Sequence, residues 1–125
     1  MPFLRSLPPT ASLLEVFKAF PETCKPLIEF HEVLLRGPSP FTEMERELIA
    51  AFVSRLNHCR YCHGVHSATA ERLGAAPGIA EKLSESIELH DAPAKLRPVL
   101  HYARKLTQAP SSKGSPKEAI CLCWR

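Results

Sequence analysis

The chain has 125 residues, a length that fits one domain with a buried core. Its 16 lysines and arginines exceed its 13 aspartates and glutamates only slightly, and these charges are scattered along the sequence. Proteins that bind nucleic acid or membrane surfaces usually gather basic residues into a patch, so neither partner is expected. No apolar run is long enough to span a bilayer and no secretory signal is visible, which makes the cytoplasm the expected location.

The chain contains five cysteines, an odd number: Cys24, Cys59, Cys62, Cys121 and Cys123. In a chain without an export signal, cysteines are not expected to form a disulfide scaffold. Two of them stand three positions apart, in a Cys-x-x-Cys pair, and this spacing indicates redox or metal chemistry. The reactive part of the sequence is therefore expected around residues 59–62.

Two helices are predicted in the N-terminal third. Ser12 can cap a short helix that Pro21 stops, and Thr23 is the expected N-cap of the next helix, which Gly37 ends. The second helix carries a stripe at helical spacing: Leu27, Ile28, His31, Leu34 and Leu35. His31 is interpreted as a core histidine with a hydrogen-bond partner, in preference to a histidine that contributes to a site.

A central, well-buried helix is predicted over residues 42–56. Thr42 and Glu45 form a capping-box pattern at its start, and its apolar residues cover about half of the circumference. Glu47 falls at the edge of this apolar arc, next to Ala51. Its carboxylate is expected to be half-buried or to reach back to water.

Three further helices are predicted after the central one, and no strand pattern is found. One covers residues 59–73, the next covers residues 77–89, and the last is capped by Asp91. The expected fold class is all-α, a single-domain helical bundle over residues 1–107. Residues 108–125 are expected to form a Pro/Ser/Lys linker and a short tail.

On a helical wheel, both thiols and one histidine of the fourth helix share one side. Cys59, Cys62 and His66 fall within an arc of less than about 90°, and His66 leans toward Cys62 because helical side chains tilt toward the N-terminus. The first turn of a helix favours thiolate, and a nearby imidazole can accept or balance the proton. Glu47, on the preceding antiparallel helix, is placed to hold that imidazole or to receive its proton.

The pattern formed by Glu47, Cys59-Arg60-Tyr61-Cys62 and His66 resembles the signature of the alkyl hydroperoxidase D-like (peroxidase-related) branch of the carboxymuconolactone decarboxylase family. The resemblance extends over about residues 10–110 and includes the stretches 42–49 and 100–107. It implies an all-helical bundle of the alkyl hydroperoxidase D-like type, usually oligomeric.

The resemblance also implies an enzyme, a thiol-dependent peroxidase of the peroxiredoxin type that reduces organic hydroperoxides. Cys62 would be the peroxide-reacting sulfur, deprotonated through His66 with Glu47 completing the proton relay. Cys59 would then resolve the sulfenic acid into a disulfide, which an external dithiol reductant, lipoyl-type or thioredoxin-like, would reduce again. The expected partners are thus a hydroperoxide, this reductant and further copies of the chain, and no cofactor or metal is expected.

The chain departs from the family pattern in two places. The best-known members carry a histidine just before the second cysteine, where this chain has Tyr61, and His58 and His63 are the other candidate auxiliary residues beside the pair. Relatives also continue after the last predicted helix with further helices, whereas residues 108–125 follow a different pattern here. The C-terminal part of the fold is therefore expected to be truncated or diverged.

Three other interpretations of the thiol pair remain open. The stretch from Cys59 to His63 matches the c-type haem attachment motif, which would require export and a second axial ligand. The thiols with His63 or His66, and with the two cysteines of the tail, would suit zinc. A catalytically weak helical binding or scaffold homologue is the non-enzymatic alternative. The lactone decarboxylase branch of the family lacks the cysteine pair, so its chemistry is not expected.

Overall fold

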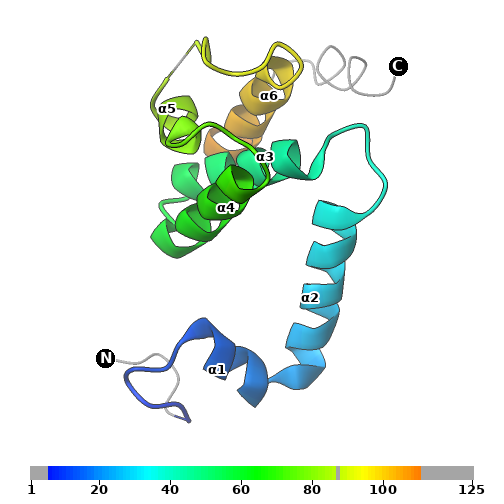
Figure 1. Ribbon diagram of the computed structural model, residues 1–125. Coiled ribbons are helices and arrows are strands. Elements are labelled where there is room, and N and C mark those ends of the chain that lie inside the picture. Colours follow the sequence, from blue (N-terminus) through cyan, green and yellow to red (C-terminus); the bar gives the residue numbers. More distant parts are fainter. Residues whose placement is uncertain (1–5, 87, 111–125) are drawn as a thin grey trace. The chain divides into compact units, whose positions relative to one another are not determined.

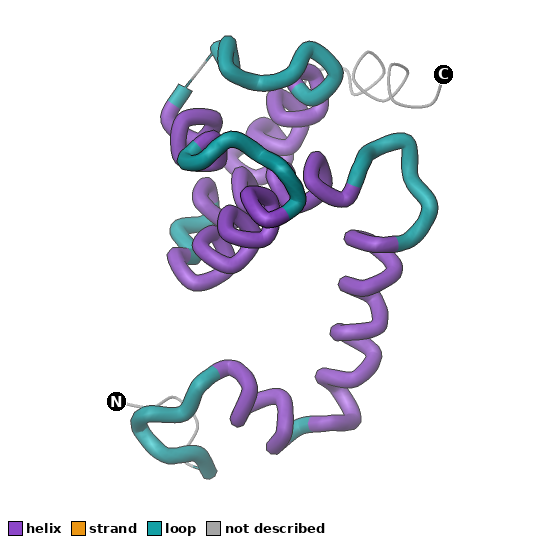
Figure 2. The backbone as a smooth tube through the Cα atoms, viewed as in Figure 1, coloured by secondary structure: helices purple, strands orange, loops and turns teal. Residues whose placement is uncertain are grey.

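All regular structure in this protein is α-helical. The computed structural model describes residues 6–86 and 88–110, and within them it contains six helices and no strand (Figure 1). The tube in Figure 2 accordingly alternates between helix and loop only. The predicted all-α class is confirmed. The chain divides into two compact units, Met1–Gly37 and Pro38–Arg125.

The first unit consists of α1 (Leu13–Ala19) and α2 (Pro21–Arg36), which contact each other. Ser12 is the N-cap of α1, as predicted, and Gly37 is the C-cap of α2. The predicted N-cap of α2, Thr23, is wrong: the helix already begins at Pro21. Proline is favoured at the first helical position because its fixed φ suits the helix and its missing N–H is not needed there.

Only one side chain of α2 is buried, that of Cys24. His31, interpreted above as a core histidine, is exposed, and its Nδ1–H donates to the Leu27 carbonyl oxygen at 2.8 Å within the same helix. The prediction failed because helical spacing identifies an apolar side of a helix but not whether anything covers that side.

The second unit is built around α3 (Glu43–Leu56), which packs against α4 (Arg60–Arg72), α5 (Ile79–Glu85) and α6 (Arg97–Gln108). The predicted capping box is present, since the Thr42 hydroxyl accepts the Glu45 N–H and the Glu45 carboxylate accepts the Thr42 N–H. Lys95 reinforces this start of α3, because its Nζ donates to the Glu45 carboxylate at 2.9 Å.

The last two helices are shorter than predicted. The helix expected over residues 77–89 ends at Glu85, because Ser86 is extended and its hydroxyl accepts the Leu89 N–H at 3.0 Å. The cap predicted at Asp91 is wrong, since residues 90–96 form turns and α6 begins at Arg97 with a proline in its first turn. That proline favours a helix start at this place.

The core of the second unit lies between these four helices. Its largest fully buried apolar side chains come from α3, α5, α6 and the loop before α6: Phe52, Leu83, Leu89, Leu96 and Leu100. Burial of this kind is the main stabilising contribution to the packing of amphipathic helices. Helix α4 packs against α3 and contributes the buried Ala70 to this core.

No helix in the described part of the chain is long and apolar enough to cross a membrane. The expected tail, including Cys121 and Cys123, lies outside the described residues from position 111 onward.

Candidate functional site

A short turn between α3 and α4 sets the position of the thiol pair. The backbone of His58 lies in the left-handed region with φ of 57°, and the Cys59 N–H donates to the Ser54 carbonyl oxygen at 2.9 Å. A non-glycine residue in this region costs about 1–2 kcal/mol, so the surrounding contacts must hold it there. The turn reverses the chain and makes Cys59 the N-cap of α4.

The sulfur of Cys59 serves as a helix cap. Its Sγ accepts the backbone N–H of Cys62 at 3.4 Å, in the position that a serine or aspartate oxygen usually occupies. The pKa of the Cys59 thiol lies below its ordinary value, because the Cys62 thiol and then the backbone N–H of Cys62 donate to the sulfur. Thiolate is therefore favoured at the first cysteine of the pair.

The pKa of the second cysteine, Cys62, is shifted in the opposite direction. The pKa of the Cys62 thiol is raised, first because its S–H is used in the hydrogen bond to Cys59, and then by burial and by the negative charge of Cys59. As pH rises, Cys59 is thus the first of the two thiols to lose its proton, and Cys62 is the second. A reaction that uses Cys62 as the nucleophile requires a base that takes this proton.

A carboxylate–histidine pair lies one turn further along the same face of α4. The Nδ1–H of His66 donates to Oε2 of Glu47 at 2.6 Å, across the α3–α4 interface. Glu47 is only 2% exposed, so the expectation that its carboxylate is half-buried or in water is wrong, while the His66 side chain is 20% exposed. This hydrogen bond fixes the tautomer and leaves Nε2 of His66 as the basic nitrogen.

The structure therefore groups the four predicted catalytic side chains into two interacting pairs. The thiols meet at the start of α4, and Glu47 meets His66 across the antiparallel helices, as the sequence predicted. His66 stands four residues after Cys62 on one continuous helix, a spacing that places their Cβ atoms within about 6 Å.

The three candidate auxiliary residues differ in their surroundings. Tyr61 and His58 are exposed beside the pair. His63 is buried, and its Nδ1 and Nε2 face the Ala51 carbonyl oxygen at 2.9 Å and Oε1 of Glu81 at 3.1 Å. Both partners are acceptors, so only the protonated ring donates to both at once. His63 thereby connects α4 to α3 and α5.

The contribution of Glu81 was missed by sequence reasoning. It lies 18 positions from His63, on a short helix whose residue pattern gives no reason to single out one acidic residue. Only the packing of α5 brings the two together.

Neither a metal cluster nor a second reactive site is apparent in residues 6–86 and 88–110. No three histidine, cysteine, aspartate or glutamate side chains in this part of the chain are arranged to hold a metal ion, so the zinc interpretation gains no ligand set there.

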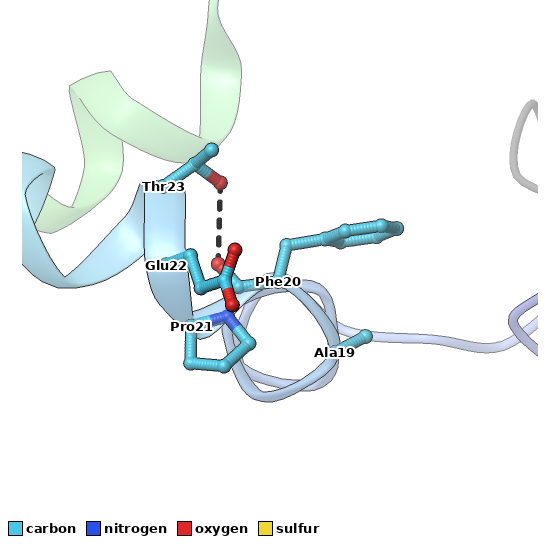
Figure 3. Close-up of a pocket in the computed structure, with 5 residues that line it drawn as sticks. All are labelled: Ala19, Phe20, Pro21, Glu22 and Thr23. Carbon is cyan, nitrogen blue, oxygen red and sulfur yellow. Dashed lines mark hydrogen bonds between the residues drawn. The ribbon is translucent and has the colours of Figure 1, made fainter.

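A hollow of about 230 Å³ is lined by Ala19 to Thr23 at the α1–α2 junction (Figure 3). Its lining is a bend of five consecutive residues, in which the Thr23 hydroxyl donates to the Phe20 carbonyl oxygen.

Comparison with known proteins identifies a family for this chain but no individual relative. No curated protein matches the sequence significantly. The sequence profile of the carboxymuconolactone decarboxylase family matches residues 21–109, a segment that includes α2 to α6 and thus both thiols, Glu47 and His66. Because this match covers well over half of the chain, the protein belongs to the carboxymuconolactone decarboxylase family.

Proposed function

We propose that this chain is a thiol-dependent peroxidase of the alkyl hydroperoxidase D-like branch, which reduces organic hydroperoxides through Cys59 and Cys62. The observation that carries the proposal is the buried hydrogen bond between Glu47 and His66, one helical turn from a thiol whose pKa is raised. A structural cysteine pair has no use for an oriented base, whereas a nucleophile that holds its proton requires one.

The reaction begins when Nε2 of His66 takes the proton of Cys62. The resulting thiolate attacks the terminal peroxide oxygen, the O–O bond breaks, and the alkoxide leaves with that proton as an alcohol. Cys62 is then a sulfenic acid, oxidised by two electrons. The buried Glu47 carboxylate stabilises the imidazolium during the transfer, because an opposite charge in a site of low dielectric favours the protonated ring.

Cys59 completes the catalytic half-cycle. Its thiolate attacks the sulfenic sulfur of Cys62, a disulfide forms, and hydroxide leaves as water after protonation. An external dithiol, lipoyl-type or thioredoxin-like, then returns two electrons and two protons by thiol–disulfide exchange. The lowered pKa of Cys59 makes it the better leaving group in that exchange.

The proposal is tested by treating the reduced protein with cumene hydroperoxide and locating the products by peptide mass spectrometry with a sulfenic-acid trap. The wild type should form the Cys59–Cys62 disulfide. Cys59→Ser should accumulate a sulfenic acid at Cys62, Cys62→Ser should lose the fast reaction, and His66→Ala should be slowed.

Cys24→Ser is the matched control, because Cys24 is a buried cysteine in the other unit of the chain. It should react like the wild type. If all variants lose thiol at the same rate, the chain is not a peroxidase of this kind, and a helical binding or scaffold role becomes the better explanation.

A further inference from the structure

The first four residues of α4, which include Cys62, contain one buried side chain, that of His63. The other two buried residues of this helix, Ser67 and Ala70, follow at helical spacing but lie in its later turns, and both are small. Tyr61, by contrast, is exposed beside the thiols. Near the thiols, the grip of α4 on its neighbours therefore depends on His63.

A histidine at this place does more than fill space. Its side chain is 10% exposed, and both ring nitrogens face acceptors on other helices. Nδ1 lies 2.9 Å from the Ala51 carbonyl oxygen of α3, and Nε2 lies 3.1 Å from Oε1 of Glu81 on α5. Apolar contacts are non-directional, whereas a hydrogen bond weakens steeply away from its preferred angle. The ring thus fixes both the rotation of α4 about its axis and its position along α3.

The link from His63 to α3 runs parallel to the link between His66 and Glu47. Ala51 follows Glu47 by four residues on α3, and His63 precedes His66 by three residues on the antiparallel α4, so the two links lie about one helical turn apart. Cys62 and His66 move together with α4, whereas Glu47 belongs to α3. A slip of α4 along α3 would therefore turn the His66 ring, which Glu47 holds, away from the thiol.

We propose that His63 is a positioning residue for the proton relay: its bond to the Ala51 carbonyl oxygen fixes α4 on α3, so that the imidazole held by Glu47 stays aimed at the Cys62 thiol. This inference rests on the proposed function, because it assigns a role within that relay. His63 acts through the position of α4 and takes no proton from Cys62 itself. Misplacement of reacting groups by about 1 Å can cost about 100-fold in rate, so a small slip is enough to matter.

Two conservative substitutions separate the two bonds of the ring. The amide nitrogen of asparagine lies near the place of Nδ1, and that of glutamine lies near the place of Nε2. His63→Asn should therefore keep the bond to Ala51 and most of the wild-type rate. His63→Gln should keep only the link to Glu81 and, like His63→Leu, should slow the reaction of Cys62 with cumene hydroperoxide by about tenfold at neutral pH. His101→Leu, at an exposed position of α6, is the matched control and should react like the wild type.

The pH profile separates a misaligned relay from a damaged fold. His63→Leu should approach the wild-type rate at alkaline pH, where Cys62 ionises without a base, and circular dichroism checks that each variant keeps its helix content. If the leucine variant does not fold, the comparison of His63→Asn with His63→Gln decides. A wild-type rate for His63→Leu at neutral pH, a deficit that is the same at every pH, or a His63→Asn variant as slow as His63→Gln would each overturn the proposal.

Alkylation of Cys62 by iodoacetamide measures the same relay without a peroxide. In a Cys59→Ser background, whose hydroxyl can cap α4, peptide mass spectrometry follows the labelling of Cys62 over the same pH series. Adding His63→Leu should slow this labelling at neutral pH and leave it unchanged at alkaline pH.

The two assays together distinguish failure of this proposal from failure of the peroxidase proposal. A wild type that does not react with cumene hydroperoxide, but whose labelling at Cys62 depends on His63, refutes the peroxidase and supports the positioning role. A wild type that reduces the peroxide through Cys62 at a rate that His63→Leu leaves unchanged refutes the positioning role alone.

Discussion

Replacing Glu47 by glutamine tests the proton relay with almost no change of shape. The amide can still accept the Nδ1–H of His66, but it carries no charge and cannot stabilise the imidazolium. A hydrogen bond to a charged partner contributes about 1.5–3 kcal/mol, and each 1.4 kcal/mol of transition-state stabilisation changes the rate about tenfold. Because the carboxylate is 2% exposed and bonded at 2.6 Å, the full range applies. Glu47→Gln should therefore slow the reaction of Cys62 with peroxide by roughly 10- to 100-fold near neutral pH.

The pH dependence distinguishes a lost base from a lost fold. Cys62 has a pKa above its ordinary value of 9.0, so at sufficiently alkaline pH it ionises without help. The rates of the variant and the wild type should then converge. Single-turnover oxidation, quenched with N-ethylmaleimide, measures both rates. Glu85→Gln, the same substitution at an exposed position in α5, is the control. Equal rates for Glu47→Gln and the wild type at neutral pH, or a difference that persists unchanged at alkaline pH, would refute the relay.

Four further substitutions test how the helices around the site are held. His58→Gly should raise the free energy of unfolding by up to about 1 kcal/mol in urea denaturation, because glycine relieves the positive φ, and a slower peroxide reaction would instead show that the imidazole takes part. His63→Leu should lower the free energy of unfolding by about 1–2 kcal/mol. Glu81→Gln should lower it by less, because the Glu81 side chain is half-exposed whereas His63 is buried. Equal effects of the two substitutions would contradict this difference in burial. Burial raises the pKa of Glu45, but the hydrogen bonds from Lys95 and Thr42 lower it more, so the folded-state pKa lies below the unfolded value of about 4.5. The ionised Glu45 therefore stabilises the fold above about pH 4.5, and this contribution is lost as the pH falls through the folded-state pKa. Glu45→Gln should therefore destabilise the protein by up to about 1 kcal/mol at neutral pH, and this difference should shrink as the pH is lowered below about 4.5, as thermal unfolding over a pH series would show.

Local signals predicted much of this fold from the sequence. Ser12, the Thr42/Glu45 capping box and Gly37 mark helix ends through contacts with residues three or four positions away, and such contacts are written in the sequence. Errors arose where two local signals competed. Thr23 is a typical N-cap residue and Pro21 a typical first helical residue, and α2 begins at Pro21.

The site was predicted in part because its residues lie on two consecutive helices. A short loop between helices makes them antiparallel neighbours, so the contact between Glu47 and His66 follows from their positions along α3 and α4. The depth of burial of Glu47 did not follow, because it depends on what covers the edge of the helix. The roles assigned to the two cysteines, and to the auxiliary residues, stay predictions until the variants are measured.

In the proposed peroxidase cycle, the cysteine cap of α4 would couple the redox state of the pair to the order of the helix that it begins. A thiolate is a strong acceptor for the Cys62 amide, whereas a disulfide sulfur is a weak one, so oxidation loosens the first turn of α4. Whatever stabilises the reduced form raises the reduction potential, and the cap therefore makes the disulfide easier to reduce. Amide hydrogen exchange at Cys62 should be slow in the reduced protein and fast in the oxidised one, so one backbone N–H reports the oxidation state of the pair.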